Sequence, residues 1–418
     1  MSVLGAAKEV GRSAFLVNSN HTSILMDYGV LLKREPIFPM HVKPKDIDAA
    51  VITHAHLDHS GFVPSLFLSE SAEIQVCGTL PTFELSQLLI EDMIKISGFY
   101  LPFEYIDLVT MMKHSKNLQY REPYMINDVK LTLHESGHLV GGATVIAEHD
   151  GKRIFYTGDI NTRGSKLLRP ADLDFGEIDL MIIESTYSQS EQIPREQSEK
   201  ELLEYAYEVI ERGGTLFIPA FSVERAQEIA CVLKTYNFRH KVVMDGMALK
   251  ANEIMMRHPT FLKNAEIFKQ SVGEAEWING WSRRKRVVNE PCIIISPAGM
   301  LVGGTAVFYM QEIAKSDKNG IALVSFQGEG TPGRALLERK VTIFDGKVKK
   351  CLADVKRFEF SGHNSRSELF EILDQLKGNP KVLTVHGDGY SCIKFAEEIE
   401  EKYGYDAKAP DAGEVIEI

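Results

Sequence analysis

The chain has 418 residues, of which 44% are hydrophobic, and a formal net charge of −11 at pH 7. It is long enough to bury two substantial cores, and it lacks the long apolar stretch that a membrane-spanning helix requires. Its acidity argues against a wide electrostatic footprint for nucleic acid. Two basic runs, 283–286 and 347–350, still allow a narrow basic groove, although a solvated turn explains the first run equally well.

Cysteine usage and the start of the chain predict the cellular compartment. The five cysteines are scattered, with no Cys-x-x-Cys pair, and the start lacks a charged region followed by an apolar one. We therefore expect reduced, mostly buried thiols in a cytoplasmic protein without a signal peptide or a membrane segment.

The pattern up to about residue 187 predicts apolar strands joined by short turns. Strands are expected at 23–26 and 49–52, the start of a helix at 62–67, and mostly helix over 81–113, where apolar residues at helical spacing serve core packing. From 194 the pattern alternates between helices at 196–212 and 223–236 and strands at 215–220, 241–245, 292–296 and 321–326. This rhythm predicts a parallel sheet covered by helices. After about 345 we expect strands that bear His363 and His386.

The segment 53–60 reads Thr-His-Ala-His-Leu-Asp-His-Ser, with three histidines and one aspartate within six residues. It lies between a predicted strand and a predicted helix, so its side chains can converge on one point. Imidazoles and a carboxylate suit Zn²⁺ or a similar divalent ion. Four ligands are too many for one catalytic site that keeps a position open for water, but they suit half of a two-metal site.

The spacing His54-x-His56-x-Asp58-His59 resembles that of the metallo-β-lactamase superfamily, and the resemblance extends over the whole chain. Asp27, at the end of a strand, matches an aspartate that orients the ligand loop from behind it. Three further positions match ligands of the family: His138 in Ser-Gly-His-Leu, Asp159 in Thr-Gly-Asp, and His386 in Val-His-Gly-Asp. His134 competes with His138, but the glycine-rich context favours His138.

Glu184, His363 and His386 resemble motifs A, B and C of the β-CASP branch, which contains nucleases. The segments 4–13, 296–301 and 327–331 are most similar to archaeal homologues of the nuclease subunit of the cleavage and polyadenylation specificity factor, with ribonuclease J next. Asn364 follows motif B where an acidic residue is often found, which leaves the tuning of His363 open.

The resemblance implies an α/β fold: a metallo-β-lactamase αββα sandwich with an inserted α/β β-CASP domain. We expect residues 1–190 and 346–418 to form the sandwich and 191–345 the insertion, which would close over the site and admit a single strand but not a duplex.

The resemblance also implies two Zn²⁺ ions, with Mn²⁺ or another divalent ion as alternatives. One ion would be held by His54, His56 and His138 and the other by Asp58, His59 and His386, with Asp159 as the bridge. Such a pair activates water for in-line phosphoryl displacement and leaves a 5′-phosphate and a 3′-hydroxyl. His363, oriented by Glu184, is the expected general acid.

Four residues are candidates for binding RNA: Arg225 at a helix start, the backbone at Gly299 and Gly303, and Ser361 as the candidate for a terminal 5′-phosphate. The implied activity is a ribonuclease acting on single-stranded RNA as an endonuclease, a 5′→3′ exonuclease or both. It would work as a monomer or homodimer, with other RNA-processing or exosome-like subunits as possible partners.

Three alternatives compete with a ribonuclease. A small-molecule hydrolase of the superfamily would not need the insertion or motifs A to C. A catalytically weak RNA-binding subunit would be expected to lack several ligands, whereas all seven are present. A DNA nuclease of the branch typically carries valine at motif C, where this chain has His386.

Overall fold

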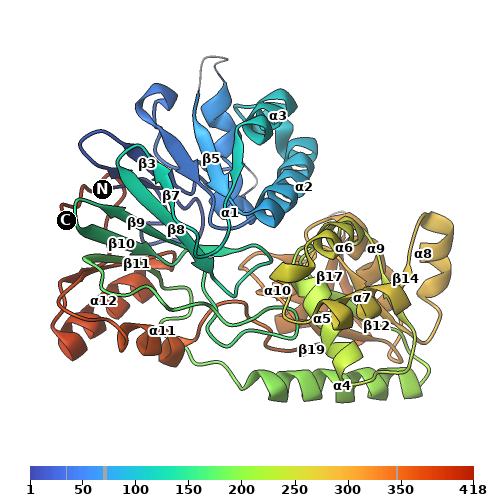
Figure 1. Ribbon diagram of the computed structural model, residues 1–418. Coiled ribbons are helices and arrows are strands. Elements are labelled where there is room, and N and C mark those ends of the chain that lie inside the picture. The colour runs from blue at the N-terminus through green and yellow to red at the C-terminus, as the bar shows by residue number, and fades with distance from the viewer. Residues whose placement is uncertain (34, 69–72, 345–346) are drawn as a thin grey trace. The chain divides into compact units, whose positions relative to one another are not determined.

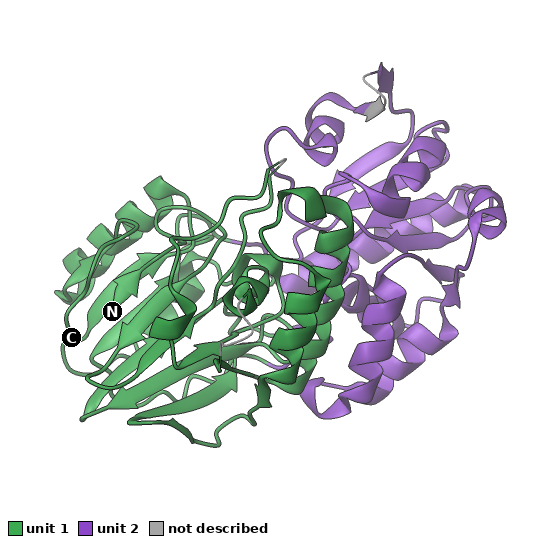
Figure 2. Ribbon diagram, turned by 90° about the horizontal axis from the view of Figure 1, so that it is seen from above, with its two compact units in different colours: residues 1–164, 170–191, 362–418 green, residues 165–169, 192–361 purple. Residues whose placement is uncertain are grey.

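A computed structural model describes residues 1–33, 35–68, 73–344 and 347–418, which form two compact units (Figures 1 and 2). Unit 1 comprises Met1–Gly164, Pro170–Glu191 and Gly362–Ile418, and unit 2 comprises Ser165–Arg169 and Gln192–Ser361. Unit 2 thus interrupts unit 1 in sequence, as an insertion does. The predicted domain border at 345/346 lies outside the described residues, and the chain returns to unit 1 only after Ser361.

Unit 1 contains two sheets, whose strand orders along the described residues are β1-β2-β3-β4-β5-β6 and β21-β20-β11-β10-β9-β8-β7. The strands of the first are Ser2–Val3, Phe15–Asn18, Ser23–Met26, Ala49–Val51, Gln75–Gly78 and Ser115–Asn117. In the order of the chain, the strands of the second are β7 Tyr124–Ile126, β8 Val129–Glu135, β9 Ala143–His149, β10 Lys152–Tyr156, β11 Leu180–Glu184, β20 Lys381–Val385 and β21 Ala407–Lys408.

Helices cover the outer face of each sheet. Buried side chains such as Phe15, Met26 and Ile182 fill the space between the two sheets. The helices of unit 1 are α1 Leu57–Ser60, α2 Leu80–Ser97, α3 Tyr105–Lys113, α11 Arg366–Leu373 and α12 Gly389–Tyr403, with 3-10 turns at Pro44–Asp46, Val63–Phe67 and Gly98–Tyr100. One further core joins the first sheet to α2 and α3, and another joins the second sheet to α11 and α12. These four layers confirm the predicted αββα sandwich.

Strand β11 of the second sheet is buried on both faces. Its residues, Leu-Met-Ile-Ile-Glu, are all buried, as is typical of a strand with layers on both sides. It pairs in parallel with β10 and β20, and the register sets Glu184 opposite Val385. Polar side chains that follow these strands therefore meet at one edge of the sheet.

Unit 2 contains the predicted parallel sheet. Along its described residues the order is β14-β13-β15-β12-β16-β19, with parallel pairing throughout. The strands are β12 Leu216–Pro219, β13 Val242–Met244, β14 Glu276–Trp277, β15 Ile293–Ser296, β16 Gly320–Leu323 and β19 Asp354–Arg357, and a separate hairpin joins β17 Val341–Phe344 to β18 Lys347–Lys350. The helices are α4 Arg195–Glu211, α5 Arg225–Thr235, α6 Ala248–Arg257, α7 Ala265–Glu274, α8 Trp281–Val287, α9 Gly304–Ile313 and α10 Pro332–Arg339, with a 3-10 turn at Pro259–Phe261.

Two observations bear on the compartment predictions. All five cysteines are buried and free. Over the described part of the chain, no helix is both long and apolar enough to cross a membrane.

Candidate metal centre and its catalytic neighbours

The ligand-rich segment leaves strand β4 and enters the short helix α1, so part of the predicted loop is helical. The amide groups of His59 and Ser60 donate to the carbonyl of His56 and close the first turn. From the other side, the amides of Ser13 and Tyr28 donate to the carbonyls of Asp58 and His59. The whole segment is therefore fixed by backbone hydrogen bonds before any ligand atom is considered.

Gly29 allows this close approach of backbone to backbone. A Cβ at this position would lie 1.8 Å from the carbonyl oxygen of Asp58. Any other residue would thus push the metal-binding segment away from the first sheet.

The remaining donors come from loops that follow other strands. His138 lies between β8 and β9, Asp159 follows β10, and His386 follows β20 with a left-handed φ of 50°. All seven predicted ligands belong to donor groups whose atoms lie within 4.8 Å of one another, namely His54/His56/His138/Asp159, His54/Asp58/His59 and His59/Asp159/His386. The structure thus brings together side chains from both ends of the sequence.

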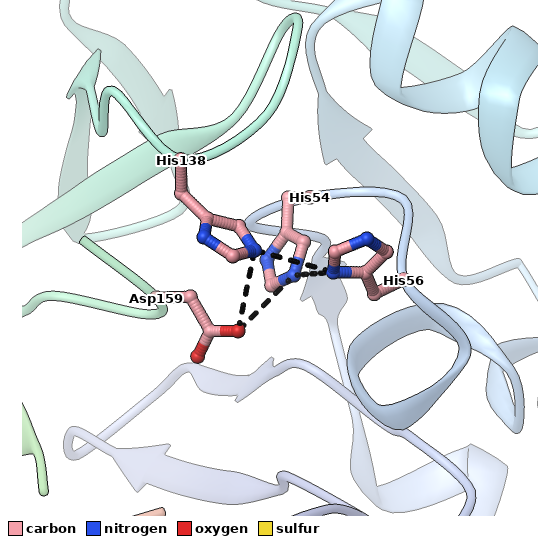
Figure 3. Close-up of side chains that lie close together, drawn as sticks. All are labelled: His54, His56, His138 and Asp159. Carbon is pink, nitrogen blue, oxygen red and sulfur yellow. Dashed lines mark hydrogen bonds and ion pairs between the residues drawn. The ribbon is translucent and has the colours of Figure 1, made fainter. Parts of the chain in front are cut away.

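Asp159 occupies the middle of the cluster. Its Oδ2 lies 3.5 Å from Nε2 of His54 and 3.5 Å from Nε2 of His138 (Figure 3). Its Oδ1 lies 3.3 Å from Nε2 of His59 and 3.4 Å from Nδ1 of His386. Each carboxylate oxygen therefore faces a different pair of imidazoles, as a bridging carboxylate would.

The donor atoms fit divalent cations. Nδ1 of His56 lies 3.2 Å from Nε2 of His54 and 3.2 Å from Nε2 of His138. Three ring nitrogens therefore converge, and neutral imidazoles have too few N–H groups to join all three by hydrogen bonds. Oδ1 of Asp159 is buried and accepts no hydrogen bond. Burial lowers the pKa of His54 and of His138 well below the ordinary value, which keeps both imidazoles in the neutral form that binds metal.

Hydrogen bonds behind the ligands fix their ring orientation. Nδ1 of His138 donates to the carbonyl of Gly362 at 2.8 Å, which leaves Nε2 free to coordinate. Nδ1 of His59 lies 2.7 Å from Oδ2 of Asp27, and donation to this carboxylate leaves its Nε2 directed at Asp159. Metal-ligating histidines characteristically have such a partner.

Asp27 has a left-handed backbone conformation, with φ 56°, and its carboxylate accepts several hydrogen bonds. Its Oδ1 accepts from the amide of Thr53, and its Oδ2 accepts from the Thr53 hydroxyl and from the Tyr156 hydroxyl, each at 2.8 Å. Sequence reasoning found Asp27 but missed Thr53 and Tyr156. Thr53 stands next to the ligand segment in sequence, whereas no local signal marks Tyr156.

His363 lies beside the metal-ligand cluster, on a loop rather than on the predicted strand. Its Nδ1 lies 2.8 Å from Oε2 of Glu184, whose Oε1 accepts from the amide of Ile160 at 2.8 Å. Burial opposes a positive charge here, but the carboxylates of Glu184 and Asp159 outweigh it and raise the pKa of His363 to about 9. The imidazole is thus biased towards its protonated, acidic form.

Two neighbouring residues bear on questions that the sequence left open. Oδ1 of Asn364 accepts from the amide and the hydroxyl of Thr162, at 2.8 and 3.1 Å, so Asn364 supports the loop that follows Asp159. Nδ1 of His134 pairs instead with Asp172 at 3.1 Å, and His134 is in none of the donor groups. The geometry therefore favours His138 as the ligand.

The four residues predicted to bind RNA all belong to unit 2, and their role stays a prediction. Arg225 is only 6% exposed, and its guanidinium donates to Glu224 and to the carbonyl of Val324. A Cβ at Gly299 would lie 2.8 Å from a serine hydroxyl, whereas one at Gly303 would meet open space. The carbonyl of Ser361 accepts from Arg195, a half-buried cation that sequence reasoning missed.

Comparison with known proteins agrees with the fold and the donor set. Three family models match successive parts of the chain: a metallo-β-lactamase superfamily domain at 16–184, a Beta-Casp domain at 226–336 and a Zn-dependent metallo-hydrolase RNA specificity domain at 350–410. Together with the cluster of histidines and aspartates, these matches define a metal-dependent hydrolase.

Relatives cover nearly the entire chain. RNase aCSPSF2 of Saccharolobus solfataricus is 34% identical, over 100% of this chain and 85% of its own length. The probable RNase MJ4 of Methanocaldococcus jannaschii is 32% identical over 99% of both chains, and the transcription termination factor FttA of the same organism is 35% identical over 96% of this chain and 69% of its own. The chain therefore belongs to the β-CASP branch of the metallo-β-lactamase superfamily, as predicted.

A solved structure supports the fold independently. The crystal structure of a protein of unknown function from Enterococcus faecalis aligns with a TM-score of 0.63, over 99% of this chain and 98% of that one. Its sequence identity is 14%, so the likeness concerns the fold alone.

Proposed function

We propose that this protein is a two-metal ribonuclease that hydrolyses single-stranded RNA to products with a 5′-phosphate and a 3′-hydroxyl. The observation that carries the proposal is the position of Asp159, whose two oxygens face separate imidazole pairs beside a histidine with a raised pKa. Support for RNA comes from the RNA specificity domain at 350–410 and from the RNases among the relatives.

The donors divide into two sets. His54, His56 and His138 would hold one ion, and Asp58, His59 and His386 the other, with Asp159 shared. Zn²⁺ fits this mixture of imidazole and carboxylate, and Mn²⁺ is the alternative. When bound, two such ions acidify water and offset the negative charge that develops on the phosphate.

The protein itself supplies orientation and a proton. Water attacks phosphorus and loses one proton to the solvent, from which His363 is later reprotonated, and the bond from phosphorus to the 3′ oxygen breaks. His363 donates its Nε2 proton to the departing 3′ oxygen, while its Nδ1–H remains hydrogen-bonded to Glu184. The 2′-hydroxyl takes no part, which is why the upstream product keeps a free 3′-hydroxyl and the downstream product carries the phosphate.

Cleavage of single-stranded RNA labelled at either end, with added Zn²⁺ or Mn²⁺, tests the proposal. We expect 5′-phosphorylated products, loss of activity after chelation, and loss of activity in His138→Ala. His134→Ala is the matched control, because this histidine lies four positions away and pairs with Asp172. Products with 2′,3′-cyclic phosphate ends would contradict the proposed chemistry.

The same assay distinguishes the cleavage modes. Circular and linear 5′-monophosphorylated RNA of the same sequence should be cut at equal rates by an endonuclease. Only the linear form should be degraded by an enzyme that needs a free 5′ end.

A further inference from the structure

Five cations at one hairpin of unit 2 have no carboxylate partner among the described residues. They lie at the end of helix α10 and on strand β18, and we name them the hairpin cations: Arg339, Lys340, Lys347, Lys349 and Lys350. All five side chains are exposed. None of them forms an ion pair with any described carboxylate.

The other basic run of this unit is different. Arg283 of the run 283–286 donates to Glu276 and to Glu290, at 2.8 and 2.9 Å. Arg284 pairs with Asp245 at 2.7 Å and lies over the ring of Trp281. Two of the four cations of that run therefore pair with carboxylates of the same unit, whereas the hairpin cations have no such pairs among the described residues.

Ordinary structural roles explain only part of the hairpin cluster. Arg339 and Lys340 end helix α10, where positive side chains stabilise the exposed carbonyl groups. Lysine on a short edge strand also prevents pairing with other chains. Strand β18, however, carries Lys347 and Lys349 on one face and Lys350 on the other, which is more charge than either role requires.

The chain as a whole makes this concentration unusual. Its net charge is −11, yet residues 334–350 contain six basic and two acidic side chains. At physiological ionic strength charges act over about 8 Å, so a local cluster attracts a polyanion that the whole molecule repels. Lys347 and Lys349 are separated by about 6.6 Å along an extended strand, comparable to the spacing of neighbouring phosphates in an extended nucleic acid.

We propose that the hairpin cations, which belong to unit 2 whereas the metal donors belong to unit 1, bind the phosphate backbone of the RNA substrate. The proposal rests on the ribonuclease function proposed above. Lysine ammonium groups act as point charges without base preference, so this contact is independent of sequence. It would hold a long RNA on an acidic enzyme without contributing to the chemical step.

Replacing the lysines by glutamine, which is polar but uncharged, tests the proposal. The triple variant Lys347→Gln, Lys349→Gln, Lys350→Gln is made in a His363→Ala background, and binding of a labelled 30-nucleotide single-stranded RNA is measured over a salt series. Each lost phosphate contact reduces the slope of log affinity against log salt by about 0.7, so we expect a slope smaller by about 2 and affinity about tenfold weaker at low salt.

A matched variant controls for net charge. Lys200→Gln, Lys250→Gln, Lys269→Gln removes three exposed lysines from α4, α6 and α7 of the same unit. It should leave the slope unchanged. An unchanged slope in the hairpin variant, or an equal change in both variants, would overturn the proposal.

An assay with a small phosphodiester distinguishes failure of this proposal from failure of the proposed ribonuclease function. With His363 intact, the hairpin variant should hydrolyse bis(p-nitrophenyl) phosphate at the wild-type rate, because that substrate is too small to need a second contact. If wild type cleaves neither this compound nor RNA, the ribonuclease proposal fails. The salt dependence of RNA binding still decides the role of the hairpin cations.

Discussion

Oε2 of Glu184 lies 2.8 Å from Nδ1 of His363, although 179 positions separate the two residues in sequence. Glu184 ends strand β11, and His363 stands at the point where the chain re-enters unit 1. A second hydrogen bond, from the amide of Ile160, holds the carboxylate in place. This pair orients the imidazole that we propose as the proton donor of the site.

Replacing His363 should impair the chemical step. We expect His363→Ala to slow RNA cleavage by roughly 10²- to 10⁴-fold, the usual contribution of a general acid, with the metal content unchanged. Single-turnover cleavage and metal analysis of the same preparation check this. Loss of metal in the variant would instead make His363 a ligand.

Replacing Glu184 should move the pH profile. The carboxylate raises the pKa of His363, and the general acid is active only while protonated. Activity should therefore decline as the pH rises through the pKa of His363, and Glu184→Gln should shift this alkaline limb to lower pH. The pH dependence of kcat/KM measures the shift, and a limb that stays in place would refute the coupling.

The number of metals should be two per chain, because seven donors with one shared carboxylate exceed the needs of one ion. His386→Ala should lose about one of the two. Elemental analysis checks the count, and a single ion whose content is unaffected by this variant would exclude the second site. Because only the folded state presents the site, chelation should also lower the melting temperature.

The Tyr156 hydroxyl should strengthen metal binding through Asp27 and His59. Tyr156→Phe removes one of the donors to Asp27 without changing the ring that packs against Phe15. Loss of a partner behind a ligand typically weakens metal affinity by 10- to 100-fold, and we expect about tenfold because Thr53 still donates. Competition with a chromogenic chelator measures this change.

A tyrosine in the other unit provides the control for Tyr156. Tyr309 is also fully buried, and its hydroxyl donates to Asp245 at 2.7 Å. Tyr309→Phe should alter stability but not metal affinity. Equal loss of affinity in both variants would mean that Tyr156 acts only through general stability.

Acid should weaken the ion cluster around Arg283. Hydrogen bonds from Arg283 lower the pKa of Glu276 and of Glu290 to about 2, from an ordinary value of 4.5. Such groups stabilise the folded state above the ordinary value, and this contribution disappears as the pH falls towards 2. Arg283→Met should therefore lower the melting temperature at pH 6 and lower it less at pH 3, where part of the ionic contribution is already lost.

An exposed arginine is the control for the acid experiment. Arg239 lies on the loop before β13 and has no carboxylate partner among the described residues. Arg239→Met should change the melting temperature little at either pH. A deficit for Arg283→Met that is as large at pH 3 as at pH 6 would exclude the ionic explanation.

The sequence by itself determined the fold class and identified the candidate metal donors. His54, His56, Asp58 and His59 are close in sequence, so their chemistry is visible without a structure. The helices expected at 196–212 and 223–236 and the four strands expected in unit 2 agree with the structure to within a few residues, because period and glycine placement act locally. Helices α6 to α10 were not predicted. The lysines of the hairpin could also be identified from the sequence. Whether carboxylates pair with them could not.

Only the tertiary structure decided which distant groups meet. Tyr156 donates to Asp27 across 129 positions, and Asn364 supports Thr162 across 202. Such contacts depend on strand register and on backbone conformations like the left-handed φ of His386, which no local pattern encodes. The border after Ser361 likewise follows from β19, whose pairing with β16 keeps that stretch in unit 2. Local composition selects the residues that can do chemistry, and long-range pairing determines which of them do it together.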